Sequence, residues 1–219
     1  MTKIKICGIT GEDEIATLNE TGVDYAGFVL YKKSKRYVTV QKARQLFEKL
    51  NKDIRKVAVA VAPESELIEE IGRAGFDLLQ LHGVDATEAE RIAAQTKLPV
   101  WLAVNLRDPA EVRRWRQEEY HRIAGVVLDA GAYGSGKTFG WEQNGQDEMC
   151  CAVRAFREEL LAEGRTFVLA ENVAEGIRIF APDVADVSSG VETLCDGTRA
   201  KSIIKIKEFK KSVQKTEGV

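Results

Sequence analysis

Eight short apolar runs, spaced along the whole chain, constrain its fold more than any other feature. Each run has four to six residues rich in Val, Ile and Leu, and most lack strict alternation of apolar and polar residues. Such runs are typical of strands that are buried on both faces. They start at Lys3, Tyr25, Lys56, Leu78, Val100, Gly125, Phe167 and Val184.

Longer amphipathic segments with charged residues separate these runs. The spacing of Leu67, Ile68 and Ile71 places them on one face of a helix. Gly22 and Gly75 stand just past predicted helix ends, where a left-handed residue commonly ends a helix. The pattern predicts helices over residues 12–20, 40–50, 64–74, 85–96, 109–121, 149–163, 172–180 and 201–213.

Eight strand–helix units in series predict an α/β fold, a (β/α)8 TIM barrel that forms a single domain over residues 1–219. Parallel strands need crossover helices, and closing the sheet removes its exposed edges. An open, doubly wound sheet is the alternative. The seventh unit is short, because the predicted seventh and eighth strands start only 17 residues apart.

Composition excludes several other classes of protein. With 44% hydrophobic residues and 4 prolines, the chain can bury a large core. The 32 Lys and Arg nearly balance the 34 Asp and Glu, which argues against nucleic-acid binding. No apolar stretch approaches the roughly 20 residues of a membrane helix, and no signal peptide is recognisable, so we expect a cytoplasmic protein without membrane contact. The 4 cysteines lack metal-binding spacing, so no metal site is expected.

Side chains capable of chemistry end or follow several predicted strands. Active sites of (β/α)8 barrels are built at the C-terminal ends of the strands, so these residues are expected to face one mouth. They are Cys7 after the first strand, Arg36 after the second, Gln80 and His82 in the fourth, Asp129 at the end of the sixth, and Asp186, Ser188, Ser189 and Gly190 at the eighth.

These residue types suggest roles but also have structural interpretations. Cys7 and Asp129 suit a base and an acid, because a thiolate accepts a proton and a carboxylic acid donates one. Cys7 also suits a small buried side chain, and Asp129 a helix cap. Arg36 suits either a substrate carboxylate or a solvated loop, and the backbone N–H groups of residues 188–190 suit a phosphate or a plain turn. His82 lines the pocket or satisfies a buried hydrogen bond.

Residues 131–138 match the phosphate-binding pattern GxxxxGK[ST] of nucleotide hydrolases. That motif requires a helix to begin at Lys137-Thr138. The residues that follow include two glycines and an Asn-Gly pair, which indicate turns. We therefore favour a mobile active-site flap, with Lys137 adding a positive charge to the mouth.

Five segments together make the chain resemble the phosphoribosylanthranilate isomerases of tryptophan biosynthesis. They are KICGIT, GFVLYKKSKRYV, LQLHG, VVLDAGAYGSGKTFGW and DVSSGVET, in order over nearly the whole chain. The resemblance implies a cofactor-free Amadori rearrangement of N-(5-phosphoribosyl)anthranilate to 1-(2-carboxyphenylamino)-1-deoxyribulose 5-phosphate, an aldose–ketose isomerisation. Barrel isomerases of the histidine pathway, and those with dual substrates, use an aspartate where this chain has Cys7, so both are disfavoured.

The resemblance also implies a role for each site residue. Cys7 is the general base and Asp129 the general acid. The substrate-binding residues are Arg36, which pairs with the anthranilate carboxylate, Gln80, His82 and Asp186, which line the pocket, and Ser188, Ser189 and Gly190, the last two of which hold the phosphate through backbone N–H groups. The implied partner is a small phosphosugar, bound by a monomer or a homodimer.

One segment departs from the family pattern. Members usually continue from the seventh strand as LAGGLxPENV, whereas here Leu169-Ala170 runs directly into Glu171-Asn172-Val173, five residues shorter. The missing glycines would bring backbone donors close to the phosphate, and Glu171 adds a negative charge. The alternative function is therefore a non-catalytic or impaired phosphosugar-binding homologue.

Overall fold

Eight parallel strands form a closed barrel, so the predicted barrel is confirmed and the open sheet is wrong. The computed structural model describes residues 1–105, 112, 115, 121–129, 148–170, 173–195 and 198–216. Each strand pairs with the next along the chain, and the last pairs back with the first. The strands are β1 (Lys3–Cys7), β2 (Tyr25–Val29), β3 (Arg55–Val61), β4 (Leu78–His82), β5 (Val100–Asn105), β6 (Ile123–Asp129), β7 (Thr166–Ala170) and β8 (Val184–Val187).

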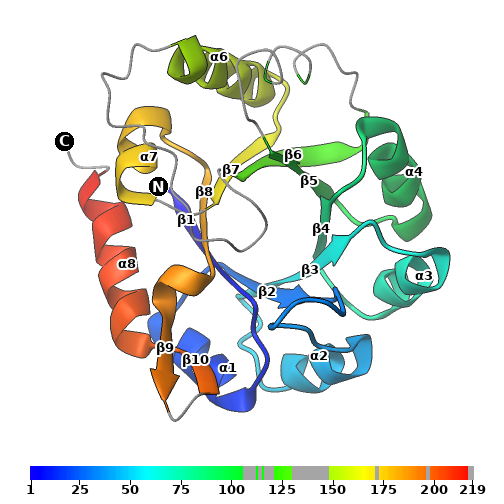
Figure 1. Ribbon diagram of the computed structural model, residues 1–219, viewed down its shortest axis with the longest axis vertical. Coiled ribbons are helices and arrows are strands. Elements are labelled where there is room, and N and C mark those ends of the chain that lie inside the picture. Colours follow the sequence, from blue (N-terminus) through cyan, green and yellow to red (C-terminus); the bar gives the residue numbers. More distant parts are fainter. Residues whose placement is uncertain are drawn as a thin grey trace.

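Helices surround the barrel on the outside (Figure 1). They are α1 (Glu12–Thr21), α2 (Val40–Phe47), α3 (Ser65–Arg73), α4 (Ala86–Thr96), α6 (Glu148–Ala162), α7 (Val173–Phe180) and α8 (Ile203–Thr216). Gly22 has a φ of 59° and Gly75 one of 86°, so both glycines after helices adopt the expected left-handed conformation. The predicted helix over 109–121 lies almost wholly outside the described residues.

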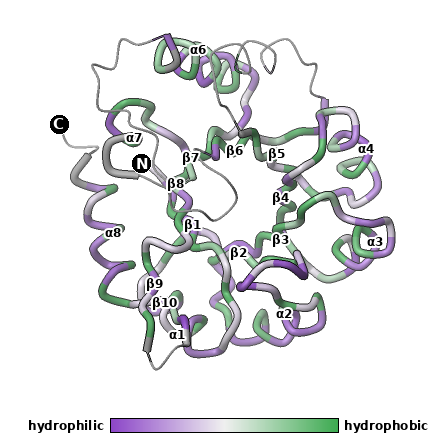
Figure 2. Tube along the Cα trace, viewed as in Figure 1, coloured by the Kyte–Doolittle hydropathy of each residue, from purple (hydrophilic) through white to green (hydrophobic). Residues whose placement is uncertain are grey.

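Two apolar layers explain why the strands carry near-continuous hydrophobic sequence. One layer lies between the strands and the helices and includes Ile6, Phe28 and Leu81. The other fills the barrel and includes Tyr25 and Trp101, whose ring centroids are 5.1 Å apart. Figure 2 shows this as largely hydrophobic strands inside helices of mixed character. Each strand therefore has two buried faces.

A β-hairpin follows β8, where the sequence predicted a turn leading directly to a helix. Residues after β8 form a short 3-10 helix, η1 (Ser189–Val191), and then the antiparallel pair β9 (Glu192–Cys195) and β10 (Thr198–Lys201). The predicted last helix therefore begins too early, because Lys201 ends β10 and α8 starts at Ile203.

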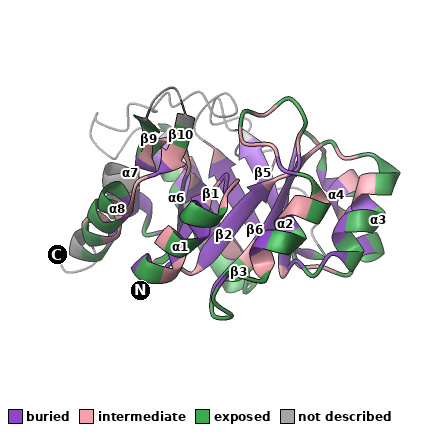
Figure 3. Cartoon of the chain, turned by 90° about the horizontal axis from the view of Figure 1, so that it is seen from below, coloured by how far each residue is buried: buried purple, intermediate pink, exposed green. Residues whose placement is uncertain are grey.

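The hairpin and the N-terminus lie at opposite ends of the barrel (Figure 3). The C-terminal ends of β1 to β8 meet on the hairpin side, and the hairpin stands beside that mouth. Within the described ranges, every helix is too short or too polar to cross a bilayer.

Candidate active site

A cavity of about 390 Å³ opens at the C-terminal ends of the barrel strands. The structure brings seven of the nine predicted site residues to its wall: Cys7, Arg36, Gln80, His82, Asp129, Asp186 and Ser188. The other two, Ser189 and Gly190, belong to η1 and are not among the lining residues. Side chains from β1, β4, β6 and β8 thus converge on one space, as the barrel fold predicts.

Cys7 contacts the neighbouring segments of the chain on both sides of β1. Gly27 on β2 is its register partner, and a Cβ built on Gly27 would lie 2.9 Å from Cys7 Sγ. On the other side, Ser188 Oγ donates a hydrogen bond of 3.0 Å to the Cys7 carbonyl. Burial raises the pKa of the Cys7 thiol, and the positive charge of Lys5 opposes that rise. The glycine at position 27 therefore leaves room for the sulfur.

A buried ion pair lies next to Cys7 inside the barrel. Lys5 on β1 is completely buried, and its Nζ lies 2.6 Å from Asp186 Oδ2 on β8. Burial alone would lower the pKa of Lys5, but the negative charges of Asp186 and Cys7 raise it above its usual value. Lys5 is thus an ammonium ion throughout the physiological range. Sequence reasoning missed it, although the alternation in KIKIC puts Lys5 on the same strand face as Cys7.

Gln80 and His82 lie on the same face of β4 and interact through their Nε2 atoms at 2.8 Å. Burial lowers the pKa of His82 to about 3, with a further contribution from the charge of Lys5, so the imidazole is neutral at physiological pH. Among the described residues, Gln80 Oε1 and Asp186 Oδ1 are buried and have no hydrogen-bond donor. A ligand with hydroxyl groups would supply donors to both oxygens.

Arg36 makes a bidentate ion pair that sequence reasoning did not foresee. Its Nε and Nη2 donate to the two carboxylate oxygens of Glu192 on β9 at 2.6 and 2.9 Å. The Arg36 side chain passes over Gly8, where a Cβ would collide with Arg36 Cδ. Glu192 also accepts from Lys201 Nζ at 2.8 Å and from Arg199 Nη1 at 3.3 Å. The hairpin therefore fixes the guanidinium at the cavity wall.

Lys201 is another departure from expectation, since the sequence placed it at the start of an amphipathic helix. Its side chain is completely buried, and Nζ donates to the carbonyl of Ser188 as well as to Glu192. Lys201 thereby links the end of β8 to the hairpin. A signal for Glu192 existed in the sequence, because Glu192 belongs to the segment DVSSGVET.

Two predicted features cannot be compared with the structure. The flap with the GxxxxGK[ST] pattern, including Lys137, lies outside the described residues, and so does the β7–α7 connection at Glu171 and Asn172. Asp129 precedes the first of these segments and is the register partner of Ala170 on β7.

The Glu192 ion pairs are expected to make stability depend on acidity. Burial would raise the pKa of Glu192, but hydrogen bonds from Arg36 and Lys201 lower it to about 2, below the unfolded value of about 4.3. Their contribution is complete above the unfolded pKa and is lost as the pH falls through the folded pKa. The free energy of unfolding, measured by urea titration, should decrease from about pH 5 to pH 2.

Glu192→Gln should flatten this decrease, because glutamine carries no charge to lose. Glu158→Gln, on the exposed surface of α6, should retain the wild-type slope. Equal slopes for Glu192→Gln and the wild type would show that these ion pairs do not stabilise the fold.

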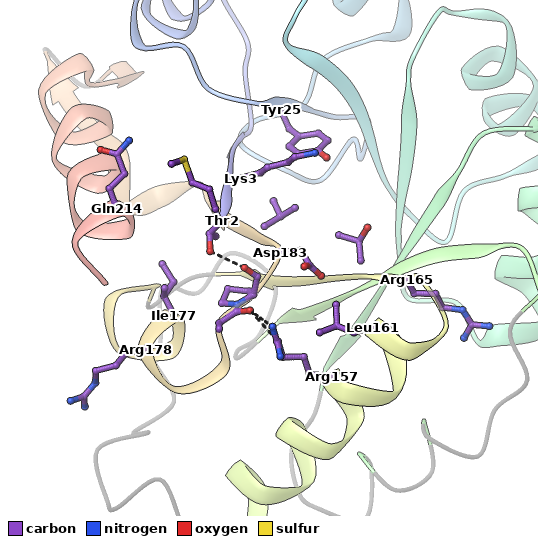
Figure 4. Close-up of a pocket in the computed structure, with 16 residues that line it drawn as sticks. Thr2, Lys3, Tyr25, Arg157, Leu161, Arg165, Ile177, Arg178, Asp183 and Gln214 are labelled. Carbon is purple, nitrogen blue, oxygen red and sulfur yellow. Dashed lines mark hydrogen bonds between the residues drawn. The ribbon is translucent and has the colours of Figure 1, made fainter. Parts of the chain in front are cut away.

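A larger cavity of about 1160 Å³ lies at the opposite, N-terminal face of the barrel. Lys3 and three arginines line it: Arg157 donates to the Ala181 carbonyl at 2.7 Å, and Arg165 and Arg178 point away from the hollow (Figure 4). The Asp183 carboxylate on this wall accepts a hydrogen bond from the Phe167 amide at 2.8 Å. The predicted catalytic residues Cys7 and Asp129 line the smaller cavity, which is therefore the candidate active site.

No cluster of three or more His, Cys, Asp or Glu side chains suited to a metal ion occurs in the part of the chain that the structure describes. The groups on the wall of the smaller cavity are the Cys7 thiol, the carboxylates of Asp129 and Asp186, the neutral imidazole of His82, and several cations. This set suits proton transfer on an anionic small molecule.

Comparisons with known proteins agree with this chemistry. The family model "N-(5'phosphoribosyl)anthranilate (PRA) isomerase" matches residues 4–212. The N-(5'-phosphoribosyl)anthranilate isomerase of Clostridium acetobutylicum is 36% identical over 222 residues, which is 98% of this chain and 99% of that protein.

Solved structures of the same enzyme are also similar. One is a complex with reduced 1-(o-carboxyphenylamino)-1-deoxyribulose 5-phosphate, with a TM-score of 0.76, 30% identity, and coverage of 98% of this chain and 100% of that chain. Another describes monomers derived from the dimeric enzyme of Thermotoga maritima, with the same TM-score, identity and coverage.

Proposed function

The chain belongs to the N-(5'-phosphoribosyl)anthranilate isomerase family, and from this premise we propose that Cys7 and Asp129 catalyse the Amadori rearrangement of N-(5-phosphoribosyl)anthranilate. The observation that carries the proposal is the convergence of both residues with Arg36 on one cavity of about 390 Å³. The enzyme is an isomerase of tryptophan biosynthesis, and the reaction converts an aminoaldose into an aminoketose without net oxidation or reduction.

The proposed reaction begins with two proton transfers and ends with a tautomerisation. Asp129, as the general acid, protonates the furanose ring oxygen and opens the ring to a Schiff base. Cys7, as the general base, then removes the C2′ proton and becomes a thiol, which leaves an enolamine that tautomerises to the ketone. The base and the acid act at different atoms of the substrate, which is consistent with their positions on β1 and β6 of the barrel.

Charges and open acceptors at the site support a substrate with a carboxylate and hydroxyl groups. Glu192 holds the Arg36 guanidinium at the cavity wall, and this planar group is suited to bind a substrate carboxylate. The buried oxygens Gln80 Oε1 and Asp186 Oδ1 would accept from the sugar hydroxyls. The neutral imidazole of His82 would line the pocket without adding charge.

The phosphate is proposed to bind the backbone N–H groups of Ser189 and Gly190 in η1, beside Ser188 at the cavity wall. The shortened connection after β7 removes glycines that would give further donors. We therefore expect a higher KM for the phosphosugar than in relatives with the longer connection. The dimeric and monomeric forms of the Thermotoga maritima relative suggest either state for this chain.

The proposal is tested by complementation. A tryptophan auxotroph that lacks this isomerase should grow without tryptophan when it expresses the wild-type chain, but not when it expresses Cys7→Ala to the same level. Absence of growth with a folded wild-type protein would favour the alternative, a phosphosugar-binding homologue without catalysis.

A further inference from the structure

Lys5 is an unusual residue for its place in the fold. The interiors of (β/α)8 barrels are filled mainly by branched apolar side chains, and the other layer-forming residues here include Val57, Val127 and Val168. Lys5 instead places a positive charge in this interior with 0% of its surface exposed. A buried cation is costly unless it is paired, so its presence needs an explanation.

Asp186 supplies the pairing that lets this charge persist. Lys5 and Asp186 are register partners on the adjacent strands β1 and β8, and Nζ–Oδ2 is 2.6 Å. The ammonium is therefore held in one position by a neighbour on the rigid barrel wall. Replacing both by apolar residues is often neutral or stabilising for a fold, so stability alone does not account for the pair.

Cys7 lies two residues after Lys5 on the same strand, so both side chains point into the barrel. The β2 backbone at Gly27 lies close to the thiol, since a Cβ there would be 2.9 Å from Cys7 Sγ, and Ser188 after β8 holds the Cys7 carbonyl. The charge of Lys5 lowers the pKa of Cys7 against the larger effect of burial, which raises it. Burial disfavours the negatively charged thiolate that a base requires, and the nearby positive charge of Lys5 favours it.

We propose that Lys5 is a positioning residue for the reaction: its ammonium group, clamped by Asp186, supplies the fixed positive charge against which the Cys7 thiolate forms. This inference rests on the proposed function, because it takes Cys7 as the general base. During the step the thiolate takes the C2′ proton and becomes a thiol, while Lys5 keeps all three of its protons. Lys5 therefore acts through Cys7 and does not exchange protons with the substrate.

Other charged groups also surround Cys7. Asp186 on β8 raises the pKa of the thiol, and Lys201 on β10 lowers it. Lys201 has a smaller effect than Lys5, and its Nζ holds the Ser188 carbonyl and Glu192. The other titratable or charged side chains on the cavity wall are Tyr31, Lys33, Lys35, Arg36, His82, Asp129 and Arg199.

The test measures how readily Cys7 forms a thiolate. Alkylation of Cys7 by iodoacetamide is followed from pH 6 to pH 11 by peptide mass spectrometry, which separates it from the other cysteines. In Lys5→Met the midpoint should move up by about one pH unit or more, and kcat at pH 7 should fall about tenfold or more with little change in KM. Lys56→Met, which removes a half-exposed lysine paired with Asp77, should leave both unchanged.

A second variant guards against misfolding caused by an unpaired Asp186. The alkylation midpoint of the double variant Lys5→Met/Asp186→Asn is compared with that of Asp186→Asn alone. Neither protein contains an unpaired carboxylate at position 186. The double variant should have the higher midpoint, because it lacks the charge of Lys5. An unchanged midpoint in these comparisons would overturn the role of Lys5. Full activity of Cys7→Ala would instead overturn the proposed function, so the two failures are distinguishable.

Discussion

Cys7→Ala is expected to lower kcat by about 10²- to 10⁴-fold, because alanine cannot accept the C2′ proton that we assign to the Cys7 thiolate. The KM for the phosphosugar should change little, since we assign binding of the non-reacting parts of the substrate to Arg36 and the backbone of η1. The measurement is the steady-state rate of purified protein, followed by the loss of N-(5-phosphoribosyl)anthranilate fluorescence.

Cys151→Ala is the matched control for this variant. Cys151 is an exposed cysteine on α6, far along the chain from the strand ends that form the cavity, so its removal should leave kcat unchanged. If Cys7→Ala retained the wild-type kcat, the proposed base would be wrong, whatever the behaviour of the control.

Asp129→Asn should also lower kcat by about 10²- to 10⁴-fold, for a different reason. Asparagine keeps the size and shape of the side chain at the end of β6 but cannot donate a carboxylic proton to the ring oxygen. The defect should therefore lie in ring opening. A substrate that populates more of the open form should recover more of its rate in Asp129→Asn than in Cys7→Ala.

Asp53→Asn gives the comparison for charge alone, because Asp53 is exposed in the connection between α2 and β3. It should have wild-type kinetics. Equal rates for Asp129→Asn and the wild type would contradict the role of Asp129 as the general acid.

Much of the fold could be predicted because its causes are local. Buried parallel strands require apolar residues on both faces, so the runs around Val57 and Val126 were recognisable, and the left-handed turn after α1 required Gly22. The hairpin β9–β10 was missed because Thr198–Lys201 has no apolar pattern. Its two strands pair with each other, and an ion pair between Glu192 on β9 and Lys201 on β10 links them.

For the candidate site too, the features with local causes could be predicted and the contacts between distant residues could not. The barrel rule places strand ends at one mouth, so Cys7, His82 and Asp129 were predictable as neighbours before any coordinates. The pairing of Arg36 with Glu192 joins residues 156 positions apart. No pattern in a single sequence specifies an ion-pair partner at such a distance along the chain. The ion pair between Lys5 and Asp186 could not be predicted for the same reason.

The Lys5–Asp186 pair spans 181 residues and joins the first strand to the last strand of the barrel. The hydrogen bond from Ser188 to Cys7 joins the first strand to the residue just after the last strand. The groups that we assign to proton abstraction thus stand at the seam where the two ends of the chain meet. A nascent or refolding chain can form its helices and most of its neighbouring strand pairs while it remains inert, because contacts between distant ends form late. The time at which enzymatic activity appears during refolding would therefore report when β1 and β8 pair and the barrel closes.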